Sequence, residues 1–276
     1  MTSNLEWNGQ YGFSNHYEKK CVISDSIEGL WISQEKRLPM KNYVILLAGG
    51  VGKRMQAEMP KQFIEVKGKP IIVYTIEKFQ QNSQIEKIVV VCVKDWIDHL
   101  KELIKKYALT KVEWITEGGN TGHDSIRNGV FFLKNKIAPD DFIIVHDAVR
   151  PVLPQKAIDE VLRVAHENGN ASSSIACHPP IVYTEDFKSG ITDVDREHVM
   201  LTASPQAYKY SLALKCYEIA ERENRHDFTF TSSLLIHCGE RVYFAKGTTS
   251  NIKVTQKEDL ALFEALLSIP EDLLYS

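Results

Sequence analysis

Four short, largely apolar runs recur along the chain after residue 40. Because neighbouring positions are apolar, these runs lack the alternation of a strand that has one face in water. They are typical of strands that are buried on both faces of a parallel sheet. The predicted strands cover residues 43–48, 87–93, 141–145 and 171–177.

The stretches between these runs show helical spacing instead. Residues 97–107 place their apolar side chains on one helical face, with Asp95 available as N-cap. Apolar side chains in residues 158–165 repeat at i, i+3, i+4 and i+7. A last helix is predicted behind a capping box formed by Thr255 and Glu258. The alternation of strands and helices predicts an α/β fold with a Rossmann-like, doubly wound, mostly parallel sheet.

Two segments do not follow this alternation. Residues 1–39 are polar with scattered aromatic residues, and we interpret them as an N-terminal extension to a domain of residues 40–276. Residues 178–204 contain two prolines, a glycine and many charges. A long irregular segment in a compact domain is usually functional or part of an interface, so it is interpreted as a projecting arm. An ordinary surface loop is the alternative.

Composition narrows the possible classes of protein. The chain has 276 residues, 43% of them hydrophobic, and a net charge of −3. With no positive field, neither nucleic acid nor an anionic membrane is an expected partner. The five cysteines contain no C-x-x-C pair, which favours reduced thiols in a cytoplasmic protein. No apolar run is long enough to span a bilayer, and no signal peptide is visible.

A glycine-rich loop follows the first predicted strand directly. Residues 48–55 read A-G-G-V-G-K-R-M, and P-K-Q follows at residues 60–62. Glycines allow backbone N–H groups to approach a phosphate closely, and ligands of open α/β sheets bind beyond the carboxyl ends of the strands. Arg54 and Lys61 provide positive charge for a triphosphate and its leaving group. The candidate nucleotide-binding residues of the loop are Ala48, Gly49, Gly50, Gly52 and Lys53.

Two common phosphate-binding patterns do not fit this loop. The dinucleotide pattern G-x-G-x-x-G is incomplete because Met55 occupies the position of the third glycine. The Walker pattern requires Ser or Thr after its lysine, and here Arg54 follows Lys53. The remaining pattern, G-G-x-G-x-R-M followed by P-K-Q, resembles the signature of sugar-nucleotide pyrophosphorylases.

The P-K-Q-F sequence at residues 60–63 narrows this resemblance to the cytidylyltransferases that act on methylerythritol phosphate or ribitol phosphate. Four further segments are similar to elements of that family, and together with the loop they span residues 41 to about 267. They are Gly118-Gly119 with Asp124-Ser125-Ile126, H-D-A-V-R-P at residues 146–151, S-P-Q at residues 204–206 and N-I-K-V-T at residues 251–255.

The resemblance implies roles for individual residues. Catalysis would fall to Arg54, Lys61 and Lys253. Nucleotide binding would add Ala148 and Arg150 to the loop, and Gly118, Gly119 and Ser125 would contact the cytosine. Asp147 would hold Mg²⁺ or order the acceptor, and Arg196 and Ser204 would contact the acceptor across a homodimer. The simpler interpretations are an N-cap for Ser125, a turn with an Asp147–Arg150 ion pair, and solvated charges for Lys253 and Arg196.

The implied reaction transfers a cytidylyl group from CTP to a polyol phosphate and releases pyrophosphate. Segments at residues 94–99, 245–247 and 250–251 resemble the ribitol phosphate branch, which favours D-ribitol 5-phosphate as acceptor and CDP-ribitol, a precursor for cell-surface polysaccharides, as product. Methylerythritol phosphate is the alternative acceptor.

Two positions depart from the family pattern: Gly122 stands in the cytosine turn where arginine is common, and residues 229–232 read T-F-T-S instead of an acidic segment. A nicotinamide-dependent oxidoreductase and a catalytically silent nucleotide-binding module are alternatives from other classes.

Overall fold

The structure, a computed structural model, describes residues 39–50 and 59–275. The described residues belong to one compact unit that begins at Pro39. Three candidate residues of the glycine-rich loop, Gly52, Lys53 and Arg54, lie outside the described ranges.

A seven-stranded sheet forms the centre of this unit, in the order β11-β7-β10-β6-β1-β4-β5. The pairs of β1 with β4 and β6, of β4 with β5, and of β7 with β11 are parallel, whereas β10 runs antiparallel to both of its neighbours. The predicted mostly parallel sheet is therefore confirmed. Its strands are β1 Asn42–Ala48, β4 Ile85–Cys92, β5 Val112–Glu117, β6 Phe142–Asp147, β7 Asn170–Ala176, β10 Met200–Lys209 and β11 Phe244–Lys246.

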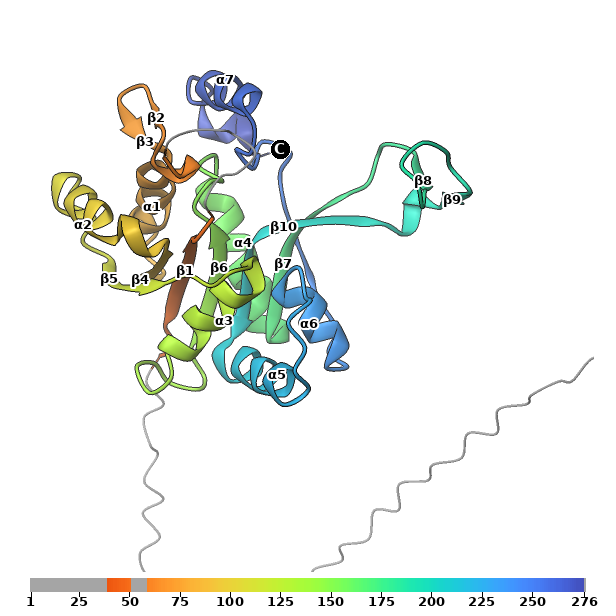
Figure 1. The fold of residues 1–276 in the computed structure, drawn as a ribbon, viewed down its shortest axis with the longest axis horizontal. Helices are drawn as coiled ribbons and strands as arrows, with labels where there is room; N and C mark the ends of the chain where they lie inside the picture. Colours follow the sequence, from red (N-terminus) through yellow and green to blue (C-terminus); the bar gives the residue numbers. More distant parts are fainter. Residues whose placement is uncertain (1–38, 51–58, 276) are drawn as a thin grey trace, which may run out of the picture. The chain divides into compact units, whose positions relative to one another are not determined.

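Two apolar cores cover the two faces of the sheet. In β1, Val44 and Leu46 contact one core, while Tyr43 and Ile45 contact the other, which explains why the strand is apolar at consecutive positions. Helices lie over both faces (Figure 1), as a doubly wound sheet requires. The first core includes α1 Ile71–Gln81, α2 Ile97–Lys106 and α4 Gln155–Asn168, and the second includes α3 Gly122–Phe132, α5 Tyr210–Arg222 and α6 Thr231–His237.

A third, smaller core lies beside the loop that follows β6. Here Phe263 of α7 (Lys257–Leu266) packs with Val149, Val152 and Val254. The short hairpin of β2 Glu65–Val66 and β3 Lys69–Pro70 contributes Val66 to the same core. This packing fixes the segment after β6 against the segment that precedes α7.

The segment interpreted as an arm contains its own small hairpin. In it, β8 Ile181–Tyr183 pairs antiparallel with β9 Thr192–Val194, and the short 3-10 helix η4 Arg196–His198 follows. Figure 1 shows the hairpin projecting away from the main sheet, connected through β7 and β10. The segment is not irregular throughout, since β10 already begins at Met200, paired with Ala176 of β7.

Two expected helix caps are wrong. Asp95 lies within the 3-10 helix η3 Lys94–Trp96, and the N-cap of α2 is Trp96, which makes no capping bond through its side chain. At α7 the N-cap is Gln256, and its capping-box partner is Asp259 rather than Glu258. The hydroxyl of Thr255 donates to the same Asp259 carboxylate. The apolar pattern located both helices, but α2 has no side-chain cap and α7 is capped by Gln256 and Asp259.

None of the helices in the described part of the chain is both long and apolar enough to cross a membrane.

Candidate active site

The carboxyl ends of the central strands surround a cavity of about 630 Å³. It lies where the glycine-rich loop leaves β1 and where Asp147 ends β6, as expected for the ligand site of an α/β sheet. Lining residues come from the first loop, the turn before α3, the loop after β6 and the segment before α7. They are Leu47, Gly49, Gly50, Lys61, Gln62, Gly119, Asn120, Thr121, Gly122, Ser125, Asp147, Val149 and Lys253.

The loop after β1 and the turn after β5 meet through glycines. A Cβ atom on Gly118 would lie 3.1 Å from the Cα atom of Gly49, and one on Gly49 would lie 2.9 Å from Ser125 Oγ. A Cβ atom on Gly119 would lie 2.1 Å from the Cβ atom of Asp124. These three glycines are thus required by close approach. At Gly122, by contrast, an added Cβ meets nothing within 4 Å.

Ser125 holds this turn but does not cap the helix. The N-cap of α3 is Thr121, in a capping box with Asp124, so the alternative interpretation of Ser125 as an N-cap is wrong. Its hydroxyl accepts a hydrogen bond from the backbone N–H of Gly119 at 3.1 Å and donates to the carbonyl of Thr121 at 2.9 Å. The serine therefore fixes the turn at the N-terminal end of α3, where helical N–H groups and the helix dipole favour electron-rich ligand atoms.

Lys61 reaches the cavity from the short 3-10 helix η2 (Lys61–Phe63). The next residue, Gln62, is buried, and its side-chain amide donates to the carbonyl of Ala48 at 2.7 Å. This hydrogen bond ties η2 to the end of β1 and so brings together the two ends of the glycine-rich loop. Sequence reasoning recognised Gln62 as part of the P-K-Q motif but not as this link.

One carboxylate, that of Asp147, binds two cationic side chains at the cavity. Asp147 Oδ1 accepts from Lys253 Nζ at 3.0 Å, and Oδ2 accepts from Arg150 Nε at 3.1 Å. Only 13% of the Asp147 side chain is exposed. Burial alone would raise the pKa of this carboxyl group, but the charges of Lys253 and Arg150 outweigh burial and lower it. The ion pair with Arg150, which the sequence offered as a purely structural alternative, therefore exists within the cavity-lining cluster.

The segment that carries Lys253 is connected to strand β10 and to the loop after β6. Asn251 is buried, and its side-chain amide donates to the carbonyl of Ser204 in β10 at 2.6 Å. Its own carbonyl accepts from Arg150 Nη1 at 2.7 Å. The backbone N–H of Val254 donates to the carbonyl of Val149 at 2.9 Å. Residues 247–254 form neither helix nor strand, so Lys253 is held by these side-chain and backbone contacts alone.

Ser204 and Arg196 lie in different places. The Ser204 hydroxyl accepts from the backbone N–H of Asp147 at 3.2 Å. It thus lies beside Asp147, a cavity-lining residue of its own chain, and a contact of Ser204 with a neighbouring subunit stays a prediction. Arg196 is exposed in η4, where it donates to the carbonyl of His178 and is not among the residues that line the cavity.

His146 stabilises the loop after β6, which carries Arg150. It is fully buried, and its Nε2 atom lies 3.1 Å from the carbonyl oxygen of Arg150, which requires the Nε2–H tautomer. Burial lowers the pKa of this imidazole to about 4. A neutral imidazole thus closes the turn that carries Asp147 and Arg150.

The cavity unites most, but not all, of the candidate residues. Gly49, Gly50, Gly119, Ser125, Lys61, Asp147 and Lys253 line it directly. Ala48, Gly118, Ala148 and Arg150 adjoin lining residues in the chain. Within the described residues, no group of three or more His, Cys, Asp or Glu side chains could hold a metal ion by themselves.

A glycine-rich loop, a turn at a helix N-terminus and a lysine–carboxylate cluster on one Rossmann-like sheet agree with the class that the family comparison shows, the nucleotidyltransferases. The family model described as "IspD: 2-C-methyl-D-erythritol 4-phosphate cytidylyltransferase" matches residues 42–269. The chain belongs to this family of cytidylyltransferases.

Relatives of this chain are described either as ribitol-5-phosphate cytidylyltransferases or as 2-C-methyl-D-erythritol 4-phosphate cytidylyltransferases. The chain is 39% identical over 225 residues to a ribitol-5-phosphate cytidylyltransferase of Lacticaseibacillus paracasei, covering 81% of this chain and 96% of the relative. A protein of the same description from Vibrio parahaemolyticus is 34% identical, with 84% and 98% covered. A 2-C-methyl-D-erythritol 4-phosphate cytidylyltransferase of Clostridium botulinum is 36% identical, with 82% and 97% covered.

Solved structures share the fold. A 4-diphosphocytidyl-2C-methyl-D-erythritol synthase from Anaerococcus prevotii superimposes with a TM-score of 0.70 at 23% identity, covering 83% of this chain and 97% of that structure. The 2-C-methyl-D-erythritol 4-phosphate cytidylyltransferase of Francisella tularensis gives 0.70 at 22% identity, covering 82% and 99%.

Proposed function

We propose that this cytidylyltransferase transfers the cytidylyl group of CTP to D-ribitol 5-phosphate, forming CDP-ribitol and pyrophosphate. The observation that carries the proposal is the placement of Asp147, Lys253 and Lys61 around one cavity together with the Gly119–Ser125 turn. One part of this cavity suits a nucleotide base, and the other offers cations to phosphates.

In this reaction an oxygen of the acceptor phosphate attacks the α-phosphorus of CTP. A new P–O bond forms while the bond from the α-phosphorus to the bridging oxygen breaks, and the electron pair leaves on pyrophosphate. No proton acceptor is needed, because a phosphate oxygen is already anionic at neutral pH. Catalysis therefore depends on positioning and on neutralising charge.

The described residues supply both contributions. Lys61 and Lys253 both line the cavity, so one would stabilise the triphosphate and the other the incoming phosphate. Asp147 holds Lys253 in place through the 3.0 Å ion pair. Arg54, which lies outside the described residues, remains a candidate for charge stabilisation on the leaving group.

A divalent cation is also part of the proposal. Asp147 provides one ionised carboxylate at the cavity, and Mg²⁺ is usually held by one or two carboxylates together with substrate phosphates. Asp147 would therefore help to hold Mg²⁺ that arrives with CTP, and the ion would supply positive charge to the phosphates.

Ribitol 5-phosphate is favoured over methylerythritol phosphate for two reasons. The relative at 39% identity has the ribitol description, whereas the Clostridium botulinum relative with the methylerythritol description is 36% identical. Segments 94–99 and 245–251 also resemble that branch. A role of the product in cell-surface polysaccharide synthesis, and a cytoplasmic location, belong to the same proposal.

The proposed function also includes a two-fold homodimer whose interface is formed by the arm, residues 178–204. The small hairpin exposes large apolar side chains: Phe187 is 93% exposed, Ile191 61% and Val182 55%. Clustered exposed apolar side chains favour burial against a partner. In such a dimer Arg196 would contact the acceptor in the neighbouring cavity.

Residues 1–39 would be an addition to the domain that is not needed for the reaction.

The test is a pyrophosphate-release assay with purified protein, Mg²⁺ and CTP against both polyol phosphates. Turnover with ribitol 5-phosphate at the higher kcat/KM supports the proposal. A higher kcat/KM for methylerythritol phosphate would replace the acceptor, and a preference for UTP or ATP would contradict the proposed nucleotide.

A further inference from the structure

The segment that carries Lys253 has no helix or strand of its own, yet its lysine must be placed precisely. Residues Glu271–Tyr275, here called the C-terminal strap, contact the start of that segment. The strap consists of the 3-10 helix η5 Glu271–Leu274 and Tyr275. The family match ends at residue 269, so the strap lies beyond it.

Two hydroxyl groups donate to a single carbonyl of the strap. Thr248 Oγ1 lies 2.5 Å from the carbonyl oxygen of Leu274, and Ser250 Oγ lies 2.8 Å from the same atom. The phenol of Tyr275 also donates to the carbonyl of Lys246 at 3.1 Å. The strap is therefore hydrogen-bonded to Lys246, at the end of β11, and to two residues of the turn at residues 248–250.

The other end of the strap is anchored in the body of the domain. One oxygen of Glu271 accepts from the backbone N–H of Gln155 at 2.6 Å, at the first turn of α4. The other oxygen accepts from Lys78 Nζ of α1 at 2.7 Å. A carboxylate at a helix N-terminus is favoured by the helix dipole. The side chain of Leu274 packs on the third core, which contains Val254.

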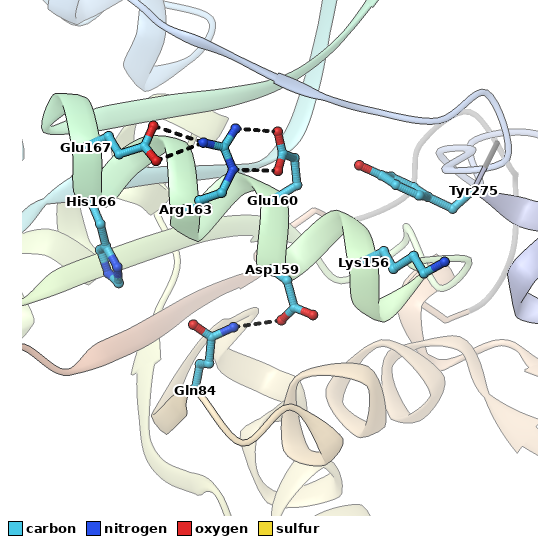
Figure 2. A pocket seen from close by; sticks show the side chains of 8 residues that line it. All are labelled: Gln84, Lys156, Asp159, Glu160, Arg163, His166, Glu167 and Tyr275. Carbon is cyan, nitrogen blue, oxygen red and sulfur yellow. Dashed lines mark hydrogen bonds and ion pairs between the residues drawn. The ribbon is translucent and has the colours of Figure 1, made fainter.

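Figure 2 shows what lies on the outer side of Tyr275, an open hollow along α4 of about 740 Å³. There Arg163 pairs with Glu160 and Glu167, and Asp159 accepts from Gln84. The charges of Arg163, Glu160 and Glu167 are paired with one another, and the Asp159 carboxylate accepts from side-chain amides. The specific contacts of the strap carbonyl are therefore directed inward, to the turn at residues 248–250.

We propose that the C-terminal strap is a positioning element for Lys253. Thr248 and Ser250 connect the strap to the lysine segment. Asn251 follows Ser250 directly and is hydrogen-bonded to Ser204 and Arg150, and Lys253 comes two residues later. The role of Lys253 in phosphate transfer rests on the proposed function. The positioning of its segment is a statement about the structure and can be measured separately.

The test uses the full chain with Thr248→Val and Ser250→Ala combined, which removes both hydroxyl donors and leaves the strap in place. Thr248→Ser keeps its donor and serves as the conservative variant. Ser268→Ala removes an exposed serine hydroxyl elsewhere and serves as a matched control. Amide hydrogen exchange of residues 251–254 is measured alongside kcat, the acceptor KM and CTP affinity.

We expect faster exchange at residues 251–254 in the double variant and a fall in kcat of about tenfold or more, as misplacement of a reacting group by a fraction of an ångström can cause. The acceptor KM should rise, and CTP affinity should stay unchanged because the Gly119–Ser125 turn is not altered. Thr248→Ser and Ser268→Ala should behave like wild type. An even loss of all parameters with a lower Tm would show a general structural role and overturn the proposal.

Unchanged exchange and unchanged kcat in a folded double variant would also overturn it. If the wild-type protein fails to release pyrophosphate, the proposed function fails, while the exchange measurement still decides whether the strap holds the segment.

Discussion

Lys253 places its ammonium nitrogen 3.0 Å from Oδ1 of Asp147, a residue 106 positions earlier in the chain. The second oxygen of the same carboxylate accepts from Arg150 at 3.1 Å. One negative charge is thus shared by two cations, which leaves this cluster with a net positive charge beside the cavity. An anionic phosphate is the natural complement of such a cluster.

The first prediction concerns this pair. Asp147→Asn keeps the shape of the side chain but removes the charge that orients Lys253, so kcat should fall by about 10²-fold. Lys253→Met should give a similar loss. Because both changes break one unit, the double variant should lose far less than the product of the two effects. Steady-state kinetics of the four proteins measures the coupling, and multiplicative losses would show that the residues act independently.

Lys61 gives the second prediction. Lys61→Ala should lower kcat by about 10²-fold or more, the scale for one preorganised electrostatic group. Thermal unfolding should change little, because this lysine buries little apolar area. Lys105→Ala, on the exposed side of α2, is the matched control and should keep full activity. If Lys61→Ala turned over CTP as fast as the control, Lys61 would have no role in the reaction.

A pH effect on stability follows from His146. Burial lowers the pKa of His146 to about 4 in the folded state, whereas an unfolded histidine titrates near ~6.5. Below the unfolded pKa the unfolded chain binds a proton that the folded chain does not, so stability is lost as the pH falls toward the folded pKa. Between pH 7 and pH 5 His146 should account for about 2 kcal/mol of lost unfolding free energy.

The variant His146→Asn has no titrating group at this position and should show a smaller loss over the same interval. Urea unfolding at the two pH values measures it. The same pH dependence in wild type and variant would mean that His146 is already protonated or solvated in the folded protein.

The dimer proposal predicts complementation. Lys61→Ala and Arg196→Ala should each be nearly inactive alone. When the two are mixed, unfolded and refolded, half of the dimers should be mixed, and each mixed dimer has one site without either change. Activity should recover to about one quarter of wild type. No recovery, or a monomer by light scattering, would show that each site is built from one chain.

The sequence predicted the fold wherever local pattern determines it. The four apolar runs became β1, β4, β6 and β7, since burial on both faces demands apolar residues at consecutive positions. Strand β10 was not predicted, because Met200–Lys209 contains polar residues and a proline and gains its partners from distant strands. Short-range pattern cannot report pairing of that kind.

Some residues of the site could be identified from local sequence pattern, and others could not. The motif residues Lys61, Asp147 and Lys253 were identified because each lies in a recognisable segment, and the structure brings them to one cavity. The links made by Gln62 and Asn251 were not, because an amide that bonds a distant carbonyl leaves no local signal. Such links decide how precisely the recognised residues are placed.

The most direct test of the account is the comparison of kcat/KM for ribitol 5-phosphate and methylerythritol phosphate, with CTP and Mg²⁺ and pyrophosphate release as readout. The account predicts a clearly higher value for ribitol 5-phosphate, with CDP-ribitol as the product by mass spectrometry. A higher value for methylerythritol phosphate, or no pyrophosphate with either acceptor, would contradict it.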